Sequence, residues 1–294
     1  MGVPSFLERS SRGEVMARLG VCSWSLQPTS PEDLVDKVRA TGLTAIQLDL
    51  TPLVDGVFDP PATLAALDGA GIAIVSTMMT TLGEDYSSLE SIRRTGGLVP
   101  DDHWNENHSR WLQALDFTQA SGASLITFHA GFLPSDPADA SYRTLGERIA
   151  TFAEDAQVRG LRVGLETGQE EAAHLLEFLS HLDAPNLGIN FDPANMILYG
   201  MGKPGPALRI LLARTLQMHI KDALPSPQPG AWGEEVPVGE GAVDWDEILE
   251  LLRRLPRCFD LLIEREAGGE RIRDIIRARD FVRTKGFPIG TGAS

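Results

Sequence analysis

Short apolar runs alternate with longer segments of helical apolar spacing along most of the chain. Apolar runs of four to seven residues are typical of buried strands, and a repeat at three and four positions is typical of amphipathic helices. The predicted strands are Leu19–Ser23, Ala45–Leu50, Ile72–Met78, Leu125–His129, Arg162–Glu166, Leu187–Phe191, Leu216–His219 and Phe259–Glu264. Because each strand is followed by a helix, the pattern predicts an α/β protein built as a single (β/α)₈ TIM barrel.

The predicted helices follow the strands in turn. Ser30 caps the first helix, Pro31 occupies its first position and Gly42 ends it. The other predicted helices are Pro61–Ala70, Asp102–Ser121, Ala138–Arg159, Glu170–Leu182, a helix near Pro206–Ala213, Asp244–Leu255 and Glu270–Lys285. We expect the barrel to span residues 19–285, between an N-terminal extension at residues 1–18 and a C-terminal tail at residues 286–294.

Two connections differ from the short turns elsewhere. The polar stretch Thr80–Pro100 is long enough to indicate a working loop or lid rather than a simple connector. The stretch Ala223–Ala242 is rich in proline and glycine, which indicates an ordered excursion that is not a helix.

Four consecutive strands of the second half end in a polar side chain. These residues are Glu166, Asp192, His219 and Glu264. Strand alternation turns each of them to the side opposite its bulky apolar neighbours, which is the inner side of the barrel. A single glutamate or histidine at a strand end is more often a solvated residue, a cap or a structural group. Four together form a mixed oxygen and imidazole set suited to one divalent cation, and three carboxylates would repel one another without one.

Composition and charge narrow the class of protein. The formal charge of −15 argues against a nucleic-acid partner, because the phosphate backbone needs a basic face. No apolar run is long enough to cross a membrane, and the first residues lack the apolar segment of a secretory signal. Cys22 and Cys258 lie far apart without metal-type spacing and are expected to be buried, reduced thiols. These features predict a cytoplasmic protein, and they leave open whether it is a homo-oligomer.

The strand-end motifs resemble those of the xylose isomerase-like superfamily. They are Gly-Leu-Glu166-Thr, Asn-Phe-Asp192-Pro-Ala-Asn195, His219-Ile-Lys221-Asp222, Val238-Gly-Glu240-Gly-Ala-Val-Asp-Trp and Ile-Glu264-Arg-Glu. The resemblance covers about residues 19–285. The superfamily includes sugar isomerases, ketose 3-epimerases, inosose dehydratases and abasic-site endonucleases. It implies that Glu166, Asp192, His219 and Glu264 hold one divalent ion, usually Mn²⁺, Mg²⁺, Co²⁺ or Zn²⁺.

The sequence departs from its relatives at two points, of which the second concerns the endonucleases. Relatives often place a histidine three residues after the aspartate of strand six, where this chain has Asn195. An amide can hydrogen-bond a hydroxyl but cannot exchange a proton near neutral pH. The chain also has only six histidines, and four of them fall in predicted helices, so the inventory does not support a trinuclear zinc centre.

Substrate contacts are assigned to Asn195 and to four residues that each have a second interpretation. His129 either contacts substrate or makes a structural hydrogen bond, and Lys221 either binds a substrate oxygen or pairs with a carboxylate. Trp24 either stacks on a sugar or packs in the core, and Glu240 either orders its loop or contacts substrate.

The favoured function is a metal-dependent isomerase or epimerase acting on a keto-sugar or related polyol carbonyl through an enediolate. Glu166 and Glu264 are the predicted catalytic residues, because they approach from different sides of the barrel mouth. Alternatives are an inosose dehydratase-like or glycoside-cleaving lyase. An abasic-site endonuclease is disfavoured by charge and missing ligands, and a non-catalytic sugar-binding barrel by the full ligand set.

Overall fold

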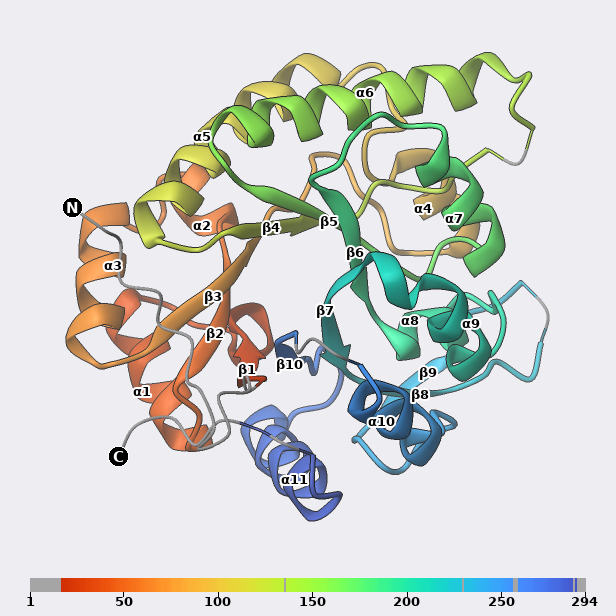
Figure 1. The fold of residues 1–294 in the computed structure, drawn as a ribbon. Coiled ribbons are helices and arrows are strands. Elements are labelled where there is room, and N and C mark those ends of the chain that lie inside the picture. The colour runs from red at the N-terminus through yellow and green to blue at the C-terminus, as the bar shows by residue number, and fades with distance from the viewer. Residues whose placement is uncertain (1–16, 135, 229, 256–258, 288, 290–294) are drawn as a thin grey trace.

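The strands close into one parallel barrel, as the sequence predicts (Figure 1). The computed structural model describes residues 17–134, 136–228, 230–255, 259–287 and 289. The strand order around the barrel is β1-β10-β7-β6-β5-β4-β3-β2. These strands are β1 (Leu19–Cys22), β2 (Ala45–Asp49), β3 (Ala73–Met78), β4 (Leu125–Phe128), β5 (Arg162–Glu166), β6 (Leu187–Phe191), β7 (Thr215–Ile220) and β10 (Leu261–Ile263).

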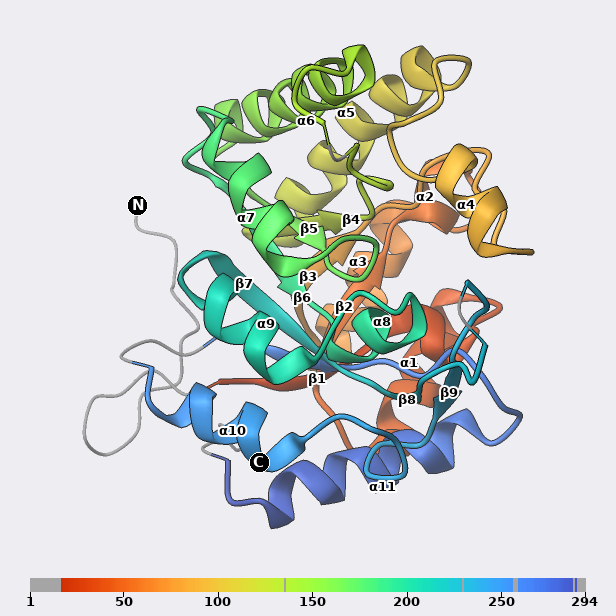
Figure 2. The ribbon, with the colours of Figure 1, turned by 90° about the vertical axis from the view of Figure 1, so that its right-hand side faces the viewer.

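Eight longer helices surround the barrel (Figures 1 and 2). They are α1 (Pro31–Thr41), α3 (Pro60–Gly69), α5 (Trp104–Ser121), α6 (Ala140–Val158), α7 (Ala172–Ser180), α9 (Pro204–Leu211), α10 (Trp245–Arg253) and α11 (Arg271–Thr284). The predicted limits of α1 are confirmed: the Ser30 hydroxyl accepts the Asp33 amide, and Gly42 ends the helix at a φ of 68°. No helix in the described part of the chain is long and apolar enough to cross a membrane.

Several short elements, most of them at the carboxyl ends of the strands, escaped the sequence analysis. They are the 3₁₀ helices η1 (Ser23–Leu26) and η2 (Leu212–Arg214), the short helices α2 (Thr51–Val54), α4 (Leu89–Thr95) and α8 (Pro193–Leu198), and the strands β8 (Asp222–Leu224) and β9 (Glu234–Val236). Of these, only η2 precedes a strand instead of following one. Elements of three to seven residues are too short to show a helical or strand period. In Figure 2, α4, α8 and the β8–β9 pair lie at the same end of the barrel.

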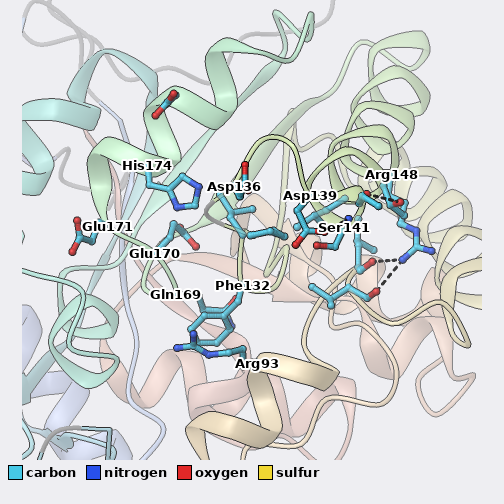
Figure 3. Close-up of a pocket in the computed structure, with 18 of the residues that line it drawn as sticks. Arg93, Phe132, Asp136, Asp139, Ser141, Arg148, Gln169, Glu170, Glu171 and His174 are labelled. Carbon is cyan, nitrogen blue, oxygen red and sulfur yellow. Dashed lines mark hydrogen bonds between the residues drawn. The ribbon is translucent and has the colours of Figure 1, made fainter.

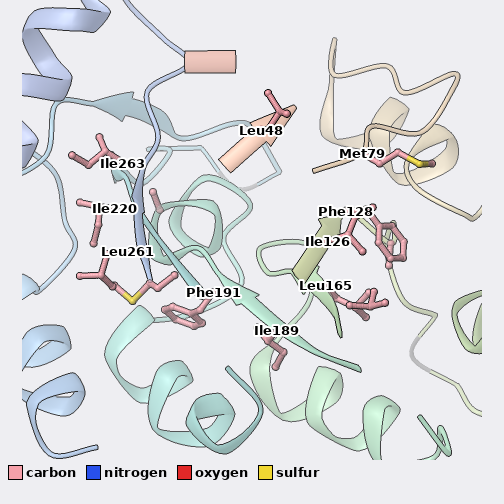
Figure 4. Packing of buried hydrophobic residues seen from close by; sticks show 14 of the residues in the cluster. Leu48, Met79, Ile126, Phe128, Leu165, Ile189, Phe191, Ile220, Leu261 and Ile263 are labelled. Carbon is pink, nitrogen blue, oxygen red and sulfur yellow. The ribbon is translucent and has the colours of Figure 1, made fainter. Parts of the chain in front are cut away.

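The apolar core lies between the strands and the helices. Figure 4 shows the strand residues that face this layer, among them Phe128 and Phe191. Trp111 of α5 and Phe152 of α6 stack at 4.4 Å between ring centroids, and Phe128 meets Trp111 edge-on at 5.4 Å. The intervening strand residues include buried polar side chains such as Gln47 and Asn190, together with glycines and a small apolar cluster that contains Leu262. Apolar packing therefore holds the wall of the barrel, while its inner side is left partly polar.

The predicted ordered excursion after β7 forms an antiparallel pair of strands, β8 and β9. Asp222 holds its two ends together. One carboxylate oxygen accepts the amides of Ala223 and Val243 at 2.9 and 3.2 Å, and the other accepts the Gly239 amide and the Trp245 indole, both at 2.9 Å. Residues 1–16 of the predicted N-terminal extension and Cys258 lie outside the described residues. Arg18, at the start of the described chain, pairs with Asp260 at 2.5 Å.

The connection predicted as a loop or lid at Thr80–Pro100 contains α4, and it is anchored where it crosses the end of β4. The Leu98 amide donates to the Ala130 carbonyl at 3.0 Å. At this crossing Gly97 has a φ of +62°, and an added Cβ would lie 2.1 Å from the Ala130 carbonyl carbon. Only glycine can adopt this left-handed conformation without strain and also leave room for the Ala130 carbonyl group.

We predict that Gly97→Ala lowers the free energy of unfolding by roughly 2–5 kcal/mol, the left-handed conformation and the overlap each contributing. Gly56→Ala is the matched control, because Gly56 has a φ of +69° with nothing within 4 Å. It should lose only about 1–2 kcal/mol. Urea unfolding measures both, and equal losses in the two variants would contradict the close approach at Gly97.

Candidate metal centre

The structure brings the four polar strand ends together at the barrel mouth. Glu166 is the last residue of β5, Asp192 follows β6, His219 lies in β7 and Glu264 follows β10. Each offers one ligand atom, and these atoms all lie within 4.8 Å of one another. All four side chains are buried. Parallel strand ends thus focus three carboxylates and one imidazole on a single small volume.

The imidazole Nδ1 atom of His219 lies at the centre of this group. It is 3.3 Å from Glu166 Oε1, 3.5 Å from Asp192 Oδ2 and 3.2 Å from Glu264 Oε2. None of these contacts has hydrogen-bonding geometry. Burial alone would lower the pKa of His219, but the charges of Glu166 and Glu264 raise that pKa well above its ordinary value.

Gln47 determines which ring nitrogen of His219 is available. The Gln47 amide nitrogen donates to Thr127 Oγ1 at 2.7 Å, which turns the amide oxygen toward His219 Nε2 at 2.8 Å. The Asn190 amide nitrogen, which can only donate, lies 2.9 Å from the same Nε2 atom. An amide oxygen can only accept, so in the tautomer that pairs with Gln47 the Nε2 atom carries a hydrogen and donates it. In the neutral ring the lone pair is then on Nδ1, facing the three carboxylates.

The two carboxylate oxygens of Asp192 have different roles: one caps a helix and the other faces the cluster. Oδ1 accepts the amides of Ala194 and Asn195 at 2.8 and 3.0 Å and so caps α8. Oδ2 is buried without a hydrogen-bond partner in the described chain, as is His219 Nδ1. Buried polar atoms without partners are costly, and these two point to the same volume. Their chemistry, with that of Glu166 and Glu264, fits one divalent cation.

Lys221 is the nearest fixed positive charge. Its ammonium lies 2.9 Å from Glu264 Oε2, 3.9 Å from Asp192 Oδ2 and 2.6 Å from Glu266 Oε2. Burial would lower the pKa of Lys221, but Glu264 and Glu266 raise it well above its ordinary value, so the side chain stays charged. Of the two interpretations drawn from the sequence, the structure shows the pairing of Lys221 with carboxylates. Its ammonium group nevertheless lies at the edge of the cluster.

Glu166 receives hydrogen bonds from two amides. Asn195 donates to Oε1 at 3.0 Å, and Asn190 donates to Oε2 at 3.3 Å. His129 Nε2 is 3.6 Å from Oε1, and His129 Nδ1 is buried without a partner in the described chain. Burial raises the pKa of Glu166, but His219 and His129 outweigh that effect and lower it. Glu166 is therefore an ionised carboxylate near neutral pH.

Trp24 and Glu240 have different surroundings. The Trp24 indole donates to Glu264 Oε1 at 2.7 Å, so this residue holds a carboxylate of the cluster. Glu240 is not brought into the buried cluster. Its carboxylate pairs with Arg277 of α11 at 2.5 Å, and about half of its side chain is exposed (49%). The loop around it is ordered by Asp222 instead.

Sequence reasoning missed three side chains beneath the cluster, Cys22, Gln47 and Asn190. Alternation along β2 and β6 could have found the last two, since each lies between bulky apolar neighbours that face the helices. Cys22, His219 and Glu264 could also form a ligand set. However, burial raises the pKa of the Cys22 thiol to about 12, and Cys22 lies 3.6 Å from the Nε2 side of the imidazole that Gln47 already occupies. The set of Glu166, Asp192, His219 and Glu264 is therefore the better candidate for binding a metal ion.

A second cavity of about 1030 Å³ opens beside the barrel mouth, between α4, α6 and α7 (Figure 3). Glu170 lines it, four residues after Glu166. The Glu170 side chain is buried and makes no hydrogen bond or ion pair with another described residue. Burial raises the pKa of Glu170 to about 8.

We predict that removing a ligand while keeping the helix cap weakens metal binding. Asp192→Asn retains an oxygen that can cap α8 but replaces the charged ligand. Affinity for Mn²⁺ should fall by more than the roughly 10–100-fold typical of an outer partner. Asp244→Asn is the control, because Asp244 caps α10 outside the site. Calorimetric titration measures both variants, and unchanged affinity in Asp192→Asn would contradict the assignment.

We predict a pH-dependent stability difference between the protein and its Glu170→Gln variant. With a folded pKa of about 8 and an ordinary value of 4.5, the unfolded chain releases this proton first as the pH rises. Glu170 therefore costs stability that grows between pH 4.5 and 8, on the order of 3 kcal/mol at neutral pH. Glu170→Gln should match the parent near pH 4.5 and melt at a higher temperature near pH 8. The same melting temperature for both proteins across this range would show that the carboxyl is not penalised.

Comparisons with known proteins agree with this fold. The family model described as a xylose isomerase-like TIM barrel matches residues 35–285. The chain is 32% identical to a xylose isomerase domain protein from Planctomyces limnophilus, with a TM-score of 0.80 over 85% of this chain and 91% of that one. It is 26% identical to an uncharacterised protein from Methanocaldococcus jannaschii, but the match covers only 55% of this chain and 56% of that relative.

Two more distant structures have the same fold. One is the probable 3-DHS dehydratase AsbF from Bacillus anthracis, at 20% identity and a TM-score of 0.68 over 91% of this chain and 99% of that one. The other is an L-ribulose 3-epimerase, at 16% identity and a TM-score of 0.68 over 92% and 94%. With the family model covering nearly the whole barrel, the chain belongs to the family of xylose isomerase-like TIM barrels.

Proposed function

We propose that this protein is a metal-dependent isomerase or epimerase of a keto-sugar or a related polyol carbonyl. The observation that carries the proposal is the convergence of His219 Nδ1 and Asp192 Oδ2, both unpartnered and buried, with Glu166 and Glu264 on either side. The sugar epimerases among the proteins of similar fold support the same reaction class.

Glu166, Asp192, His219 and Glu264 would hold the ion. When bound there, a divalent ion supplies Lewis-acid polarisation of a carbonyl and a neighbouring hydroxyl. The protein keeps the ligand orientations by itself: Gln47 fixes the His219 ring, and the cap of α8 fixes Asp192. Such fixed ligands need little reorganisation when the site is filled.

Glu166 and Glu264 are the proton-transfer residues in this proposal. They end β5 and follow β10, which are separated by β6 and β7 in the barrel, so they approach a central ligand from different directions. Neutral donors hold both residues: Asn195 and Asn190 each donate to one oxygen of Glu166, and Trp24 donates to Oε1 of Glu264. Burial raises the pKa of Glu264, but Lys221 and His219 outweigh it and lower that pKa, so both groups are ionised and able to accept a proton.

The residues around the carboxylates suit the oxygens of a polyol. Lys221 is a permanent donor at 3.3 Å from Asn195 Oδ1, and its charge can stabilise a developing oxyanion. His129 has an unpartnered Nδ1 and stands beside Glu166, where it can donate to or accept from a hydroxyl. Isomerisation needs such a relay for the hydroxyl proton, whereas epimerisation needs the two carboxylates on opposite faces.

A lyase is the second candidate, supported by Lys221. An enolate formed beside a charged ammonium could expel a β-hydroxyl or an alkoxide with Lys221 or His129 as the proton donor. The dehydratase among the proteins of similar fold is consistent with that outcome. Cleavage of abasic DNA is disfavoured by the net charge of −15 and by Asn195, which cannot replace a histidine ligand of further zinc ions.

We predict that Glu166→Gln and Glu264→Gln each lower turnover by at least the roughly 10²–10⁴-fold assigned to general base catalysis. The assay incubates metal-loaded protein with a panel of keto-sugars and inosose in D₂O and follows exchange at carbon by NMR. In an epimerase, each variant should still exchange the proton of one epimer only.

The control for this experiment is Glu247→Gln, since Glu247 lies on α10 and pairs with Arg209. It should retain full activity. Full turnover by both Glu166→Gln and Glu264→Gln, with metal still bound, would transfer the role of base to another residue. Elimination products in place of epimers would establish the lyase.

A further inference from the structure

The cavity beside the barrel mouth has polar features that the proposed reaction does not use. Figure 3 shows Glu170 and His174 on the wall formed by the start of α7, with Asp136 and Asp139 on the β4–α6 connection. His174 lies in the first turn of α7 and Glu170 in the bend before that helix, and both residues line the cavity. The His174 Nε2 atom is buried and has no hydrogen-bond partner in the described chain. Two neighbouring polar groups therefore lack partners in one cavity.

The described lining is strongly acidic. Its carboxylates are Asp101, Asp136, Asp139, Glu170, Glu171 and Glu177. Only two arginines line it, and Arg148 is already engaged by the carbonyls of Leu98 and Val99, at 2.7 and 3.1 Å, and by Asp101. Arg93 lies over the Phe132 ring, 4.6 Å from its centroid. An anionic ligand is therefore disfavoured.

A metal ion is also a poor occupant. In the described part of the cavity, no three carboxylate or imidazole ligand atoms lie close enough together to hold one, in contrast to the barrel mouth. The volume of about 1030 Å³ is at the upper end of the range for small-molecule sites. Its rim carries exposed carboxylates, among them Glu171 and Glu177, so it is open to solvent. The size and charge fit an organic cation.

We infer that this cavity is a binding site for a small organic amine, whose ammonium group pairs with Glu170 and whose remaining polar atoms are met by the acidic rim. The ammonium would supply the partner that Glu170 lacks, and a charge-assisted hydrogen bond to a buried carboxylate is strong. Phe132 also lines the cavity, but it is buried and Arg93 already lies over its ring. This site does not depend on the reaction proposed above.

The experiment titrates the protein with amines and with neutral molecules of matched shape. Cyclohexylamine is compared with cyclohexanol, and 1,4-diaminobutane with 1,4-butanediol, by calorimetry at a pH just above the Glu170 pKa of about 8, where these alkylamines remain protonated. Excess MgCl₂ is present, so that amines do not occupy the carboxylates at the barrel mouth. We expect saturable binding of at least one amine and none of its neutral counterpart.

The variants separate a specific pair from general charge. Glu170→Gln should weaken amine binding roughly tenfold or more, as expected when one partner of a buried charge pair is removed. Glu171→Gln removes the same charge one residue away on the exposed rim and should change affinity by less than about threefold, since solvent screens it. Unchanged Mn²⁺ affinity in both variants shows that the barrel is intact.

Three outcomes would overturn the inference. They are the failure of both amines to bind saturably, equal binding of a neutral counterpart, and equal losses in Glu170→Gln and Glu171→Gln. The last would show that the amines respond only to the net charge of the surface.

Discussion

The molecule is organised by the need to hold three carboxylates in a volume where they repel one another. Burial on a closed barrel removes the water that would otherwise screen them, so every neighbouring group has to supply compensation. Lys221 supplies one positive charge, and the amides of Asn190 and Asn195 and the indole of Trp24 supply hydrogen bonds. Within the cluster they leave His219 Nδ1, Asp192 Oδ2 and Glu264 Oε2 without a hydrogen-bond partner in the described chain. That remaining deficit is what makes the barrel mouth suitable for a cation.

The barrel and the location of the site could be predicted because they rest on periods visible in the chain. Alternation along a strand decides which side a residue faces, so the inward direction of Glu166 followed from Val163 and Leu165 alone. Helix limits such as Ser30 and Gly42 are local chemistry and needed no tertiary information. The limits of the barrel strands moved by no more than one or two residues for the same reason.

Other features depend on contacts between distant segments and could not be predicted in this way. Gln47 orients His219 across 172 positions of sequence, and its role appears only when Thr127 is seen to fix the amide. The alternatives for Lys221 and Trp24 could not be separated, because the choice turned on which carboxylate each one meets. The motif around Glu240 led to its prediction as a possible substrate contact. In the structure Glu240 pairs with Arg277, which lies on a helix 37 residues later and could not be linked to it from the sequence. No pattern in the sequence indicated the cavity around Glu170, because its walls come from α4, α6, α7 and the segments beside them, which are distant in the sequence.

Glu166 and Glu170 are two buried carboxylates close together in the sequence whose pKa values are shifted in opposite directions. Thr167 bonds to the backbone of Asp192, and Gly168, with a φ of +139°, lets the chain pass so close to Asn195 that a Cβ would lie 2.4 Å from it. These contacts hold Glu166 in the cluster, where histidines lower its pKa. Two residues further on, the chain has turned toward α7, and Glu170 meets no positive charge of the described residues that could lower its pKa in the same way. Both carboxylates thus lie on one tightly packed segment, Glu166 at the end of β5 and Glu170 in the bend before α7. The cavity is therefore close to the metal centre along the chain, although its lining contains none of the four predicted metal ligands.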